Sequence, residues 1–326
     1  MKEILKKIIK YTASAALAFL LLWVSFREVE WTDFREQLRS CRWEFIVLSM
    51  VAGSTAFWLR AIRWRQLLLP IDSSITRLTA FNGINIGNIS NFIFPRIGEF
   101  IRCGVISRRS QKASYDKVLG TVVLERGWEL LVMLLLLGVV VVGGFNRFGG
   151  FFVEQILAPM AQKFNFSVWW LGGILAGLAA GFLWLLWHFR EKNGFCAKVW
   201  GIVRGIGQGF SSCFRMERKW LFFAYTALIW CMYWLMAAST MWAAPFLDGL
   251  DLIDALFLSL VGGLGFAVPV PGGIGAFHFI ISLALSAVYG VPMELGVLYA
   301  TLSHTTQAIT QIIFGLASYA SESLRK

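Results

Sequence analysis

Two clusters of charged side chains interrupt stretches that are otherwise apolar. The clusters are Arg96, Glu99 and Arg102 in FPRIGEFIR, and Glu125, Arg126 and Glu129 in LERGWELL. An ionised side chain at the centre of a bilayer costs about 2.5–3.5 kcal/mol, so several together need partners or water. Guanidinium groups bind phosphate in bidentate fashion, and carboxylates can balance them or receive a cation. These residue types suit a polar cavity for a charged ligand, and an internal knot of salt bridges is the alternative.

Helix-breaking residues accompany the first cluster and recur near the C-terminus. Pro95 and Gly98 interrupt the apolar segment 75–107, in which four asparagines up to Asn91 are spaced by three. The later stretch, PVPGGIGAFHF, contains Pro269, Pro271, Gly272, Gly273 and Gly275. We expect the first segment to form a re-entrant pair of half-helices, because broken backbone survives at membrane depth only where protein or water covers it. The two short segments that flank Pro271 either form a second re-entrant pair or cross the membrane fully.

A few further polar residues fall in the last apolar segment. His304 could carry a coupling proton, or it could be a hydrogen-bonded interior histidine. We place His304, Gln307 and Asn91 with the charged residues as candidate cavity residues. The five cysteines and three histidines share no metal-ligand spacing, so the sequence predicts no metal site, disulfide framework or cofactor.

The elements that must position these residues are membrane-spanning helices. Of 326 residues, 57% are hydrophobic and 15% are charged, and apolar runs of about 18 residues recur along the chain. We therefore expect an all-α polytopic membrane protein, a single transmembrane domain over 1–326 with about six to eight transmembrane helices. The first apolar run lacks a cleavage site and is interpreted as an uncleaved span. The candidate segments are 8–26, 45–59, 118–143, 168–187, 220–242, 252–268, 276–289 and 295–319.

The basic residues predict a topology rather than a nucleic-acid ligand. With a cytoplasmic N-terminus, the cytoplasmic side holds 23 of the 30 Lys and Arg residues. This asymmetry is typical of the positive-inside rule, and it favours contact with anionic lipid. We expect both termini to be cytoplasmic, in a cell (inner) membrane. The basic, amphipathic segment 192–219 is interpreted as an interfacial helix that joins two spans.

The stretch WLRAIRWRQLLLP, residues 58–70, has two interpretations. It brings three arginines and two tryptophans to a predicted membrane boundary. Such residues commonly form an anchor belt in which long side chains snorkel to the headgroups. The alternative is a phosphate-binding rim on the cytoplasmic side.

The two broken segments match each other in order and spacing. Residues 97–100 and 274–277 share the pattern Ile-Gly-x-Phe, and each is followed by a span with polar residues in its first half. The predicted topology gives the two spans opposite directions. We therefore expect an inverted repeat with cores at 78–143 and 254–320, the arrangement in which transporters bind substrate between the halves.

The strings FPRIGEFIR, LERGWELL and PVPGGIGAFHF together resemble the transmembrane region of the lysylphosphatidylglycerol synthase family, which consists of flippase-like membrane proteins. The resemblance covers about 8–320 and implies movement of a charged-headgroup lipid between leaflets. Those synthases also carry a soluble aminoacyltransferase domain, which this sequence lacks, so we do not expect lipid aminoacylation. Glu129 stands where many relatives have aspartate, which changes the reach of that carboxylate.

The leading hypothesis is a lipid translocase for a charged-headgroup phospholipid or lipid-linked intermediate, and not an enzyme. Its partners would be anionic or zwitterionic membrane phospholipids, without nucleic acid, and a second copy of the chain or a lipid-modifying enzyme could join it. The first alternative is a glycosyl- or phosphotransferase with a lipid-linked donor, using Glu28, Glu30 and Asp33 of the short first outer loop. The second is a membrane subunit of a lipid-modifying complex. Retained lipid transport by the purified chain separates the first hypothesis from both.

Overall fold

The computed structural model describes residues 2–27, 29–157 and 217–325, with scattered single positions between 177 and 200. Every regular element in these ranges is a helix, which confirms the predicted all-α fold class. The predicted span at 168–187 and the predicted interfacial helix at 192–219 lie outside the continuously described ranges. The chain forms two compact units, one from Met1–Glu125 and Trp220–Lys326 and the other from Arg126–Lys219.

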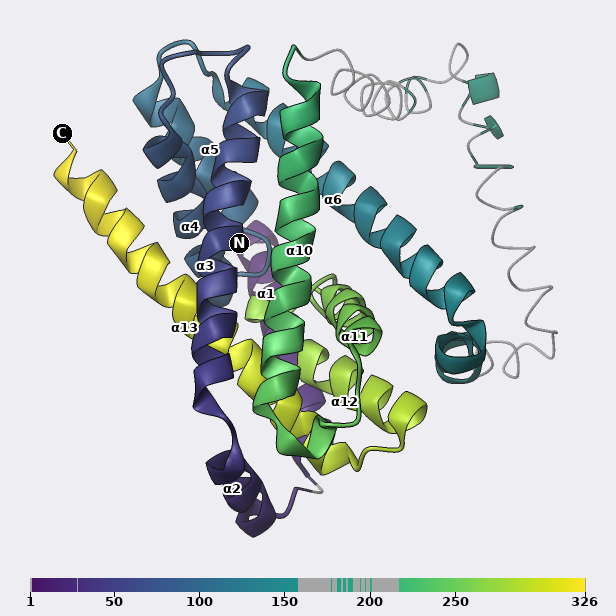
Figure 1. Ribbon diagram of the computed structural model, residues 1–326. Helices are drawn as coiled ribbons and strands as arrows, with labels where there is room; N and C mark the ends of the chain where they lie inside the picture. The colour runs from purple at the N-terminus through teal and green to yellow at the C-terminus, as the bar shows by residue number, and fades with distance from the viewer. Residues whose placement is uncertain are drawn as a thin grey trace. The chain divides into compact units, whose positions relative to one another are not determined.

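The first unit is a bundle of long and short helices (Figure 1). Its long helices α3 and α10 run side by side, and α13 crosses the bundle from the C-terminus. The long helix α6 starts in this unit and continues into the second. The elements of the first unit and α6 are α1 (Lys2–Phe26), α2 (Trp31–Ser40), α3 (Trp43–Leu68), α4 (Arg77–Ile93), α5 (Gly98–Arg109), α6 (Tyr115–Gly143), α10 (Lys219–Ala243), η3 (Pro245–Leu247), α11 (Leu252–Gly265), η4 (Pro271–Gly273), α12 (Ala276–Tyr289) and α13 (Met293–Leu324).

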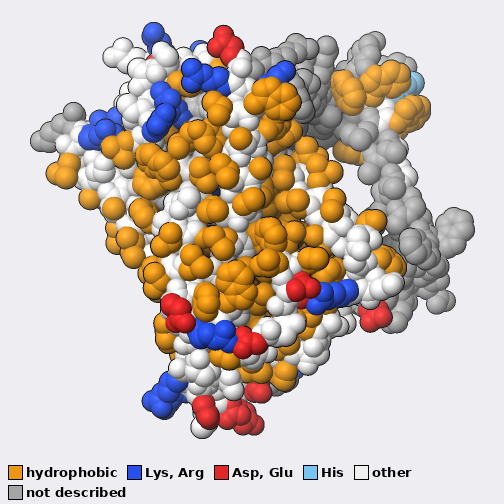
Figure 2. Space-filling view, in the orientation of Figure 1, with side chains coloured by type: hydrophobic (Ala, Val, Ile, Leu, Met, Phe, Trp, Pro, Cys, Tyr) orange, Lys and Arg blue, Asp and Glu red, His pale blue; other side chains and the backbone are white. Residues whose placement is uncertain are grey.

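The surface of the bundle matches a membrane environment. Four of the described helical segments are long and apolar enough to cross a membrane: Trp43–Leu68, Tyr115–Gly143, Lys219–Ala243 and Pro271–Tyr289. Figure 2 shows hydrophobic side chains over a broad band of α3, α10 and α13, with charged side chains gathered beyond both ends of the band. Burial of this band in hydrocarbon rather than water is favourable by roughly 25 cal/mol per Å². The protein is therefore a multi-pass membrane protein.

Two helical hairpins lie within the first unit, α4 with α5 and α11 with α12. Thr76 caps α4 by accepting a hydrogen bond from the Thr79 N–H, and Asp251 caps α11 in a capping box with Asp254. The four helices contain 17, 12, 14 and 14 residues. At 1.5 Å per residue each is about 18–26 Å long, which is shorter than a hydrocarbon core of about 30 Å. Only when η4 is counted with α12, over Pro271–Tyr289, does an arm of these hairpins reach the length of a span.

The long helix α13 ties the two hairpins together, because it packs against α12, α4 and α3. Glycines permit the close approach: a Cβ on Gly296 would lie 2.8 Å from the Ser282 Cα, and one on Gly315 would lie 2.7 Å from the Ile89 Cβ. The last turns of α13 are held by Glu322, whose carboxylate accepts hydrogen bonds from Asn82 at 2.8 Å and from Arg109 at 2.7 Å. The C-terminus of α13 thus lies at the same end of the bundle as the start of α4 and the end of α5.

The loops at that end are joined by a polar clip. The Asp72 carboxylate, in the α3–α4 loop, accepts hydrogen bonds from the Ser110 hydroxyl and the Ser74 N–H. The Ser110 oxygen in turn accepts from the Ala113 N–H in the α5–α6 loop. The hydrogen bonds from Ser110 and Ser74 to the Asp72 carboxylate lower its pKa to about 2, and the Ser110 hydroxyl has the largest effect. The clip fixes the loops that deliver α4 and α6 to the bundle.

Candidate functional site

The turns of the two hairpins contact each other. The α4–α5 turn occupies residues 94–97, and the Arg96 Nη2 donates a hydrogen bond to the Ala267 carbonyl in the α11–α12 connection at 2.6 Å. Arg96 has φ 60, a left-handed conformation that no other described non-glycine residue adopts. From the last turn of α4, the Asn91 Oδ1 accepts a hydrogen bond at 2.8 Å from the Gly98 N–H, one of the N–H groups that the start of α5 leaves without a partner inside the helix. Asn91 and Gly98 therefore shape the turn, whose Arg96 reaches the other hairpin.

The second turn is built from glycines and lies against the first. Gly272, Gly273 and Gly275 have φ 58, 77 and 83. Gly272 and Gly273 belong to the short helix η4, which follows Val270 and begins at Pro271. A Cβ on Gly272 would lie 2.6 Å from the Phe92 ring, and one on Gly275 would lie 2.6 Å from the Ala18 carbonyl of α1. The Pro269 carbonyl accepts a hydrogen bond from the Ser14 hydroxyl of α1 at 2.6 Å. Both α1 and α4 thus press on this turn at positions where only glycine fits.

A histidine pair supports the second turn from α12 and α13. His304 Nε2 lies 2.9 Å from the Gly272 carbonyl oxygen, and the rings of His304 and His278 have centroids 5.1 Å apart. The rings of Phe266 and Phe277 pack against His304 at 6.0 and 5.7 Å. Gln307 follows three residues later on α13 and is half-buried. His304 therefore has a structural partner in the turn.

Three buried arginines of the first unit surround one buried carboxylate. Glu125 on α6 is fully buried, and its Oε2 accepts a hydrogen bond from the Arg102 Nη1 of α5 at 2.7 Å. Two arginines of α3 approach its other oxygen, with Arg60 Nη2 at 3.6 Å and Arg63 Nη2 at 3.7 Å from Oε1. All three arginine side chains are less than a tenth exposed. Helices α3 and α5 thus bring three guanidinium groups to one carboxylate of α6 inside an apolar bundle.

Aromatic rings and hydroxyl groups hold these guanidinium groups. The Arg102 guanidinium lies 4.8 Å from the centroid of the Trp64 ring, whose Nε1 donates to the Thr121 hydroxyl at 3.0 Å. The Arg63 guanidinium lies 5.8 Å from the Phe222 ring of α10, and its Nη1 donates to the Thr226 hydroxyl oxygen at 3.4 Å. Stacking on aromatic rings stabilises arginine away from water by about 0.5–2 kcal/mol per pair. The guanidinium positions are therefore set by α3 and α10 as well as by Glu125.

The structure decides one open interpretation of the segment 58–70. Arg60 is 6% exposed and Arg63 is 0% exposed, whereas a snorkelling arginine keeps its charged end in the headgroup region. The anchor-belt interpretation is therefore wrong for these two residues, which belong to the buried cluster. Arg65, in the same segment, donates its Nε–H to the Ile75 carbonyl at 2.6 Å and braces the following loop. The spacing of three between Arg60 and Arg63 was the available signal that both share one helix face.

The second unit contains the remaining charged pair. Arg126 Nη1 donates to Glu129 Oε2 at 2.9 Å within α6, and the side chains are 40% and 15% exposed. Of the predicted set, Arg102 and Glu125 thus belong to the buried cluster, whereas Arg126 pairs with Glu129 on the same helix. Glu99 stands in the first turn of α5, half-buried.

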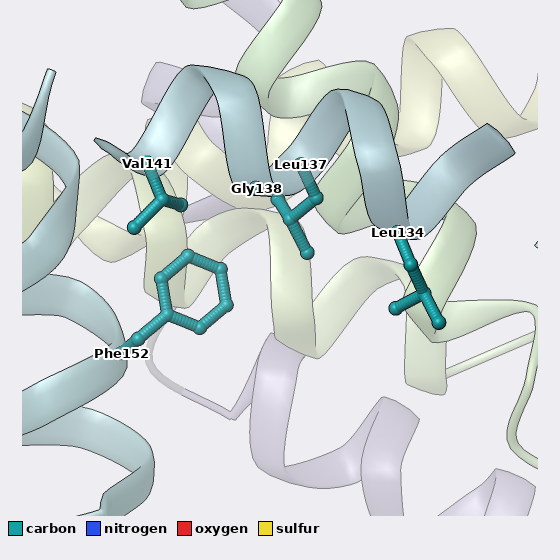
Figure 3. Close-up of a pocket in the computed structure, with 5 residues that line it drawn as sticks. All are labelled: Leu134, Leu137, Gly138, Val141 and Phe152. Atoms are coloured by element: carbon teal, nitrogen blue, oxygen red, sulfur yellow. The ribbon is translucent and has the colours of Figure 1, made fainter. Parts of the chain in front are cut away.

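An apolar hollow also lies in the second unit (Figure 3). Four residues of α6, Leu134, Leu137, Gly138 and Val141, line it, with Phe152 of the π-helical segment Phe151–Leu157 opposite. This lining suits hydrocarbon rather than a charged group. Within the described ranges, no three His, Cys, Asp or Glu side chains are grouped so as to hold a metal ion.

Comparison with known proteins identifies one relationship. The family described as the lysylphosphatidylglycerol synthase TM region matches residues 11–315, which is nearly the whole chain. No curated protein and no solved structure matches the sequence.

Proposed function

Because the chain belongs to the lysylphosphatidylglycerol synthase transmembrane-region family, we propose that it is a translocase for lipids. It moves a phospholipid with a charged headgroup, or a lipid-linked intermediate, from one leaflet to the other. The family supports a role in phospholipid modification or translocation, and the site favours translocation.

One observation carries this proposal: three arginines and a glutamate are buried together inside a bundle whose surface is apolar. Buried ion pairs contribute little net stability, because the cost of removing each ion from water offsets the attraction between them. A chain that needs only a stable bundle gains as much from well-packed apolar residues. Charged groups inside a membrane bundle are instead typical of a pathway for a polar substrate.

The two hairpins suggest how the pathway changes its access. We propose that both are re-entrant, that they enter from opposite sides of the membrane, and that their contacting turns lie near its midplane. Residues 78–143 and 254–320 would then be inverted repeats, and each should superpose on the other after rotation about an axis in the membrane plane. The hydrogen bond from Arg96 to the Ala267 carbonyl supports this arrangement, because it joins the two turns.

Transport by purified protein in lipid vesicles tests the proposal. Fluorescent phospholipids in the outer leaflet can be bleached by a membrane-impermeant reductant, and translocation appears as loss of the protected fraction. We expect Arg126→Gln to slow translocation about tenfold or more. This corresponds to a loss of ~1.4 kcal/mol or more in the free energy by which the protein stabilises the lipid during transport. Its ion pair with Glu129 is between neighbours on one helix and partly exposed, so its removal should lower stability by at most about 1 kcal/mol.

The matched control is Arg108→Gln, which removes the same charge from an exposed position near the end of α5 and should transport normally. If Arg126→Gln instead melts at a much lower temperature and its folded fraction transports normally, the residue has a structural role and its assignment to the pathway is wrong. Absence of transport by the wild-type chain would favour the transferase or subunit alternatives over a translocase.

A further inference from the structure

We infer that Arg60, Arg63 and Arg102 form a binding site for a phosphoryl anion, and that Glu125 is the internal counter-ion with which this anion exchanges. The inference rests on the proposed function and names the chemical group that the translocation site recognises. The anion is the phosphodiester of a phospholipid or a free phosphate, which share the same oxygen chemistry.

Glu125 hydrogen-bonds only one of the three guanidinium groups that surround it. Glu125 Oε2 makes a hydrogen bond of 2.7 Å with Arg102. Its Oε1 is buried and accepts no hydrogen bond from a described residue, although Arg60 and Arg63 lie 3.6 and 3.7 Å away. N···O separations of 3.6 Å and above are too long for a hydrogen bond. Glu125 therefore bonds one guanidinium and only attracts the other two.

The guanidinium groups are placed by groups other than Glu125. Trp64 lies under Arg102, and Phe222 and Thr226 hold Arg63. Their positions would persist if the carboxylate moved away, which is the preorganisation that anion binding requires. Arg60 and Arg63 also lie one turn apart on α3, so their side chains share a face of that helix.

The shape of the ligand matters as well. A carboxylate is planar and offers two oxygens along one edge, whereas a phosphoryl group is tetrahedral and directs its oxygens to several sides. Arginine forks bind such oxygens in bidentate pairs, and bonds to an ionised acceptor are about twice as strong as neutral ones. A tetrahedral anion can therefore bond guanidinium groups that arrive from α3 and α5 together, which Glu125 does not do.

The position of the site fits a headgroup. Arg60 and Arg63 precede the end of α3 at Leu68 by eight and five residues, which places them about 12 and 8 Å inside that end at 1.5 Å per residue. The four charged side chains are all less than a tenth exposed. The cluster is therefore shielded from solvent in this structure, and binding of the anion requires that α3, α5 and α6 separate to admit it.

Binding can be measured apart from transport. The protein in detergent is titrated with inorganic phosphate, with dihexanoyl phosphatidylglycerol and with dihexanoylglycerol, and its melting temperature is recorded. A ligand that binds only the folded protein raises this temperature as its concentration passes the Kd. We expect a rise with at least one phosphoryl compound and none with dihexanoylglycerol, which carries the same acyl chains without phosphate.

The two phosphoryl probes distinguish the source of the anion. A rise with dihexanoyl phosphatidylglycerol alone assigns the site to a lipid headgroup, and a rise with inorganic phosphate alone assigns it to a soluble anion. A rise with both assigns it to the shared phosphoryl group. No rise with either, or an equal rise with dihexanoylglycerol, overturns the inference. Transport of fluorescent lipid by the same preparation would show that the proposed function survives that failure.

Glu125→Gln provides the decisive variant, because glutamine keeps the shape of the side chain and removes its charge. We expect this variant to melt at a lower temperature without phosphate and to be stabilised by a phosphoryl probe more than the wild type is, with a Kd about tenfold lower. A purely structural ion cluster predicts the same loss of stability with no additional stabilisation by phosphate, and that result would overturn the inference.

Arginine variants complete the test. The double variant Arg102→Gln/Glu125→Gln removes the hydrogen-bonded pair, one charge of each sign, so the net charge of the cluster is the same as in the wild type. We expect it to bind phosphate about tenfold or more weakly than Glu125→Gln does, since it lacks one charge-assisted bond. Arg108→Gln/Glu125→Gln is the matched control and should bind like Glu125→Gln. Equal binding by the two double variants would show that the anion binds outside the cluster.

Discussion

At the residue scale, the conformation of Arg96 is the most informative single feature. Its φ of 60 lies in the region that the second turn reaches with glycines at 272, 273 and 275. A residue with a side chain loses roughly 1–2 kcal/mol in this conformation. The chain tolerates that cost at a position from which the guanidinium reaches the Ala267 carbonyl of the other hairpin. Strain retained in this way suggests that the side chain of Arg96 has a functional role.

This leads to a prediction about two replacements of Arg96. Both Arg96→Gly and Arg96→Ala remove the hydrogen bond to Ala267, but only glycine also removes the strain. We expect the glycine variant to be more stable than the alanine variant by about 1 kcal/mol, and both to transport lipid more slowly than the wild type. Thermal unfolding and the vesicle assay measure the two effects. A more stable alanine variant would show that the turn does not require a left-handed residue.

The types of the charged residues could be predicted from the sequence, but their grouping could not. Arg102 and Glu125 stood out because charge is costly in an apolar run, and the structure places them 2.7 Å apart. Arg60 and Arg63 lie beside tryptophans near the end of a predicted span. An anchor belt at the membrane interface has the same combination of arginine and tryptophan, so the sequence does not distinguish the two cases. Only the packing of α3 against its neighbours distinguishes a buried arginine from a snorkelling one, and one sequence does not contain that information.

At the element scale, proline and glycine mark the breaks well, because both act through local backbone geometry. The chain is interrupted between Ile93 and Gly98 and again between Gly265 and Ala276, at the positions that Pro95 and Pro271 indicate. The partners of the turns were not predictable, since they depend on contacts between segments about 170 residues apart. The close contact between α1 and Gly275 could not be predicted from the sequence either.

The close contact between α4 and α5 gives a prediction for a glycine. A Cβ on Gly98 would lie 2.0 Å from the Gly87 carbonyl oxygen, and this atom cannot move without shifting α4. We expect Gly98→Ala to lower the free energy of unfolding by about 1–3 kcal/mol or more. On the same helix, Gly104→Ala meets nothing within 4 Å, so its higher helix propensity should leave stability unchanged or slightly raised.

Thermal unfolding of the two glycine variants in detergent provides the comparison, and the vesicle assay reports whether the hairpin still functions. Equal melting temperatures for Gly98→Ala and Gly104→Ala would mean that α4 and α5 are not packed as tightly as the structure has them.

At the scale of the whole molecule, the first unit has two chemically different ends. The C-terminal turn of α13 is joined to α4 and α5 through Glu322, and Arg77, Arg108, Arg109, Lys112 and Lys117 lie in or beside the loops at the same end. The opposite end carries the amphipathic helix α2. There the Arg42 Nη2, at the start of α3, donates to both carboxylate oxygens of Asp248, the residue after η3. The positive-inside rule therefore predicts that the end with Glu322 faces the cytoplasm.

This assignment predicts the accessibility of introduced cysteines in intact cells. In a background without native cysteines, we expect a membrane-impermeant maleimide to label Arg35→Cys on α2 at once, and to label Lys198→Cys and Arg325→Cys only after the cells are permeabilised. Arg35 belongs to the predicted outer loop, whereas Arg325 lies beside the Glu322 carboxylate at 3.6 Å. Because Glu322 also binds Arg109 and Asn82, the result for Arg325 fixes the side of the whole end. Labelling of Arg325→Cys from outside would show that the bundle has the opposite orientation in the membrane. The arginine cluster would then face the outer leaflet rather than the cytoplasmic one.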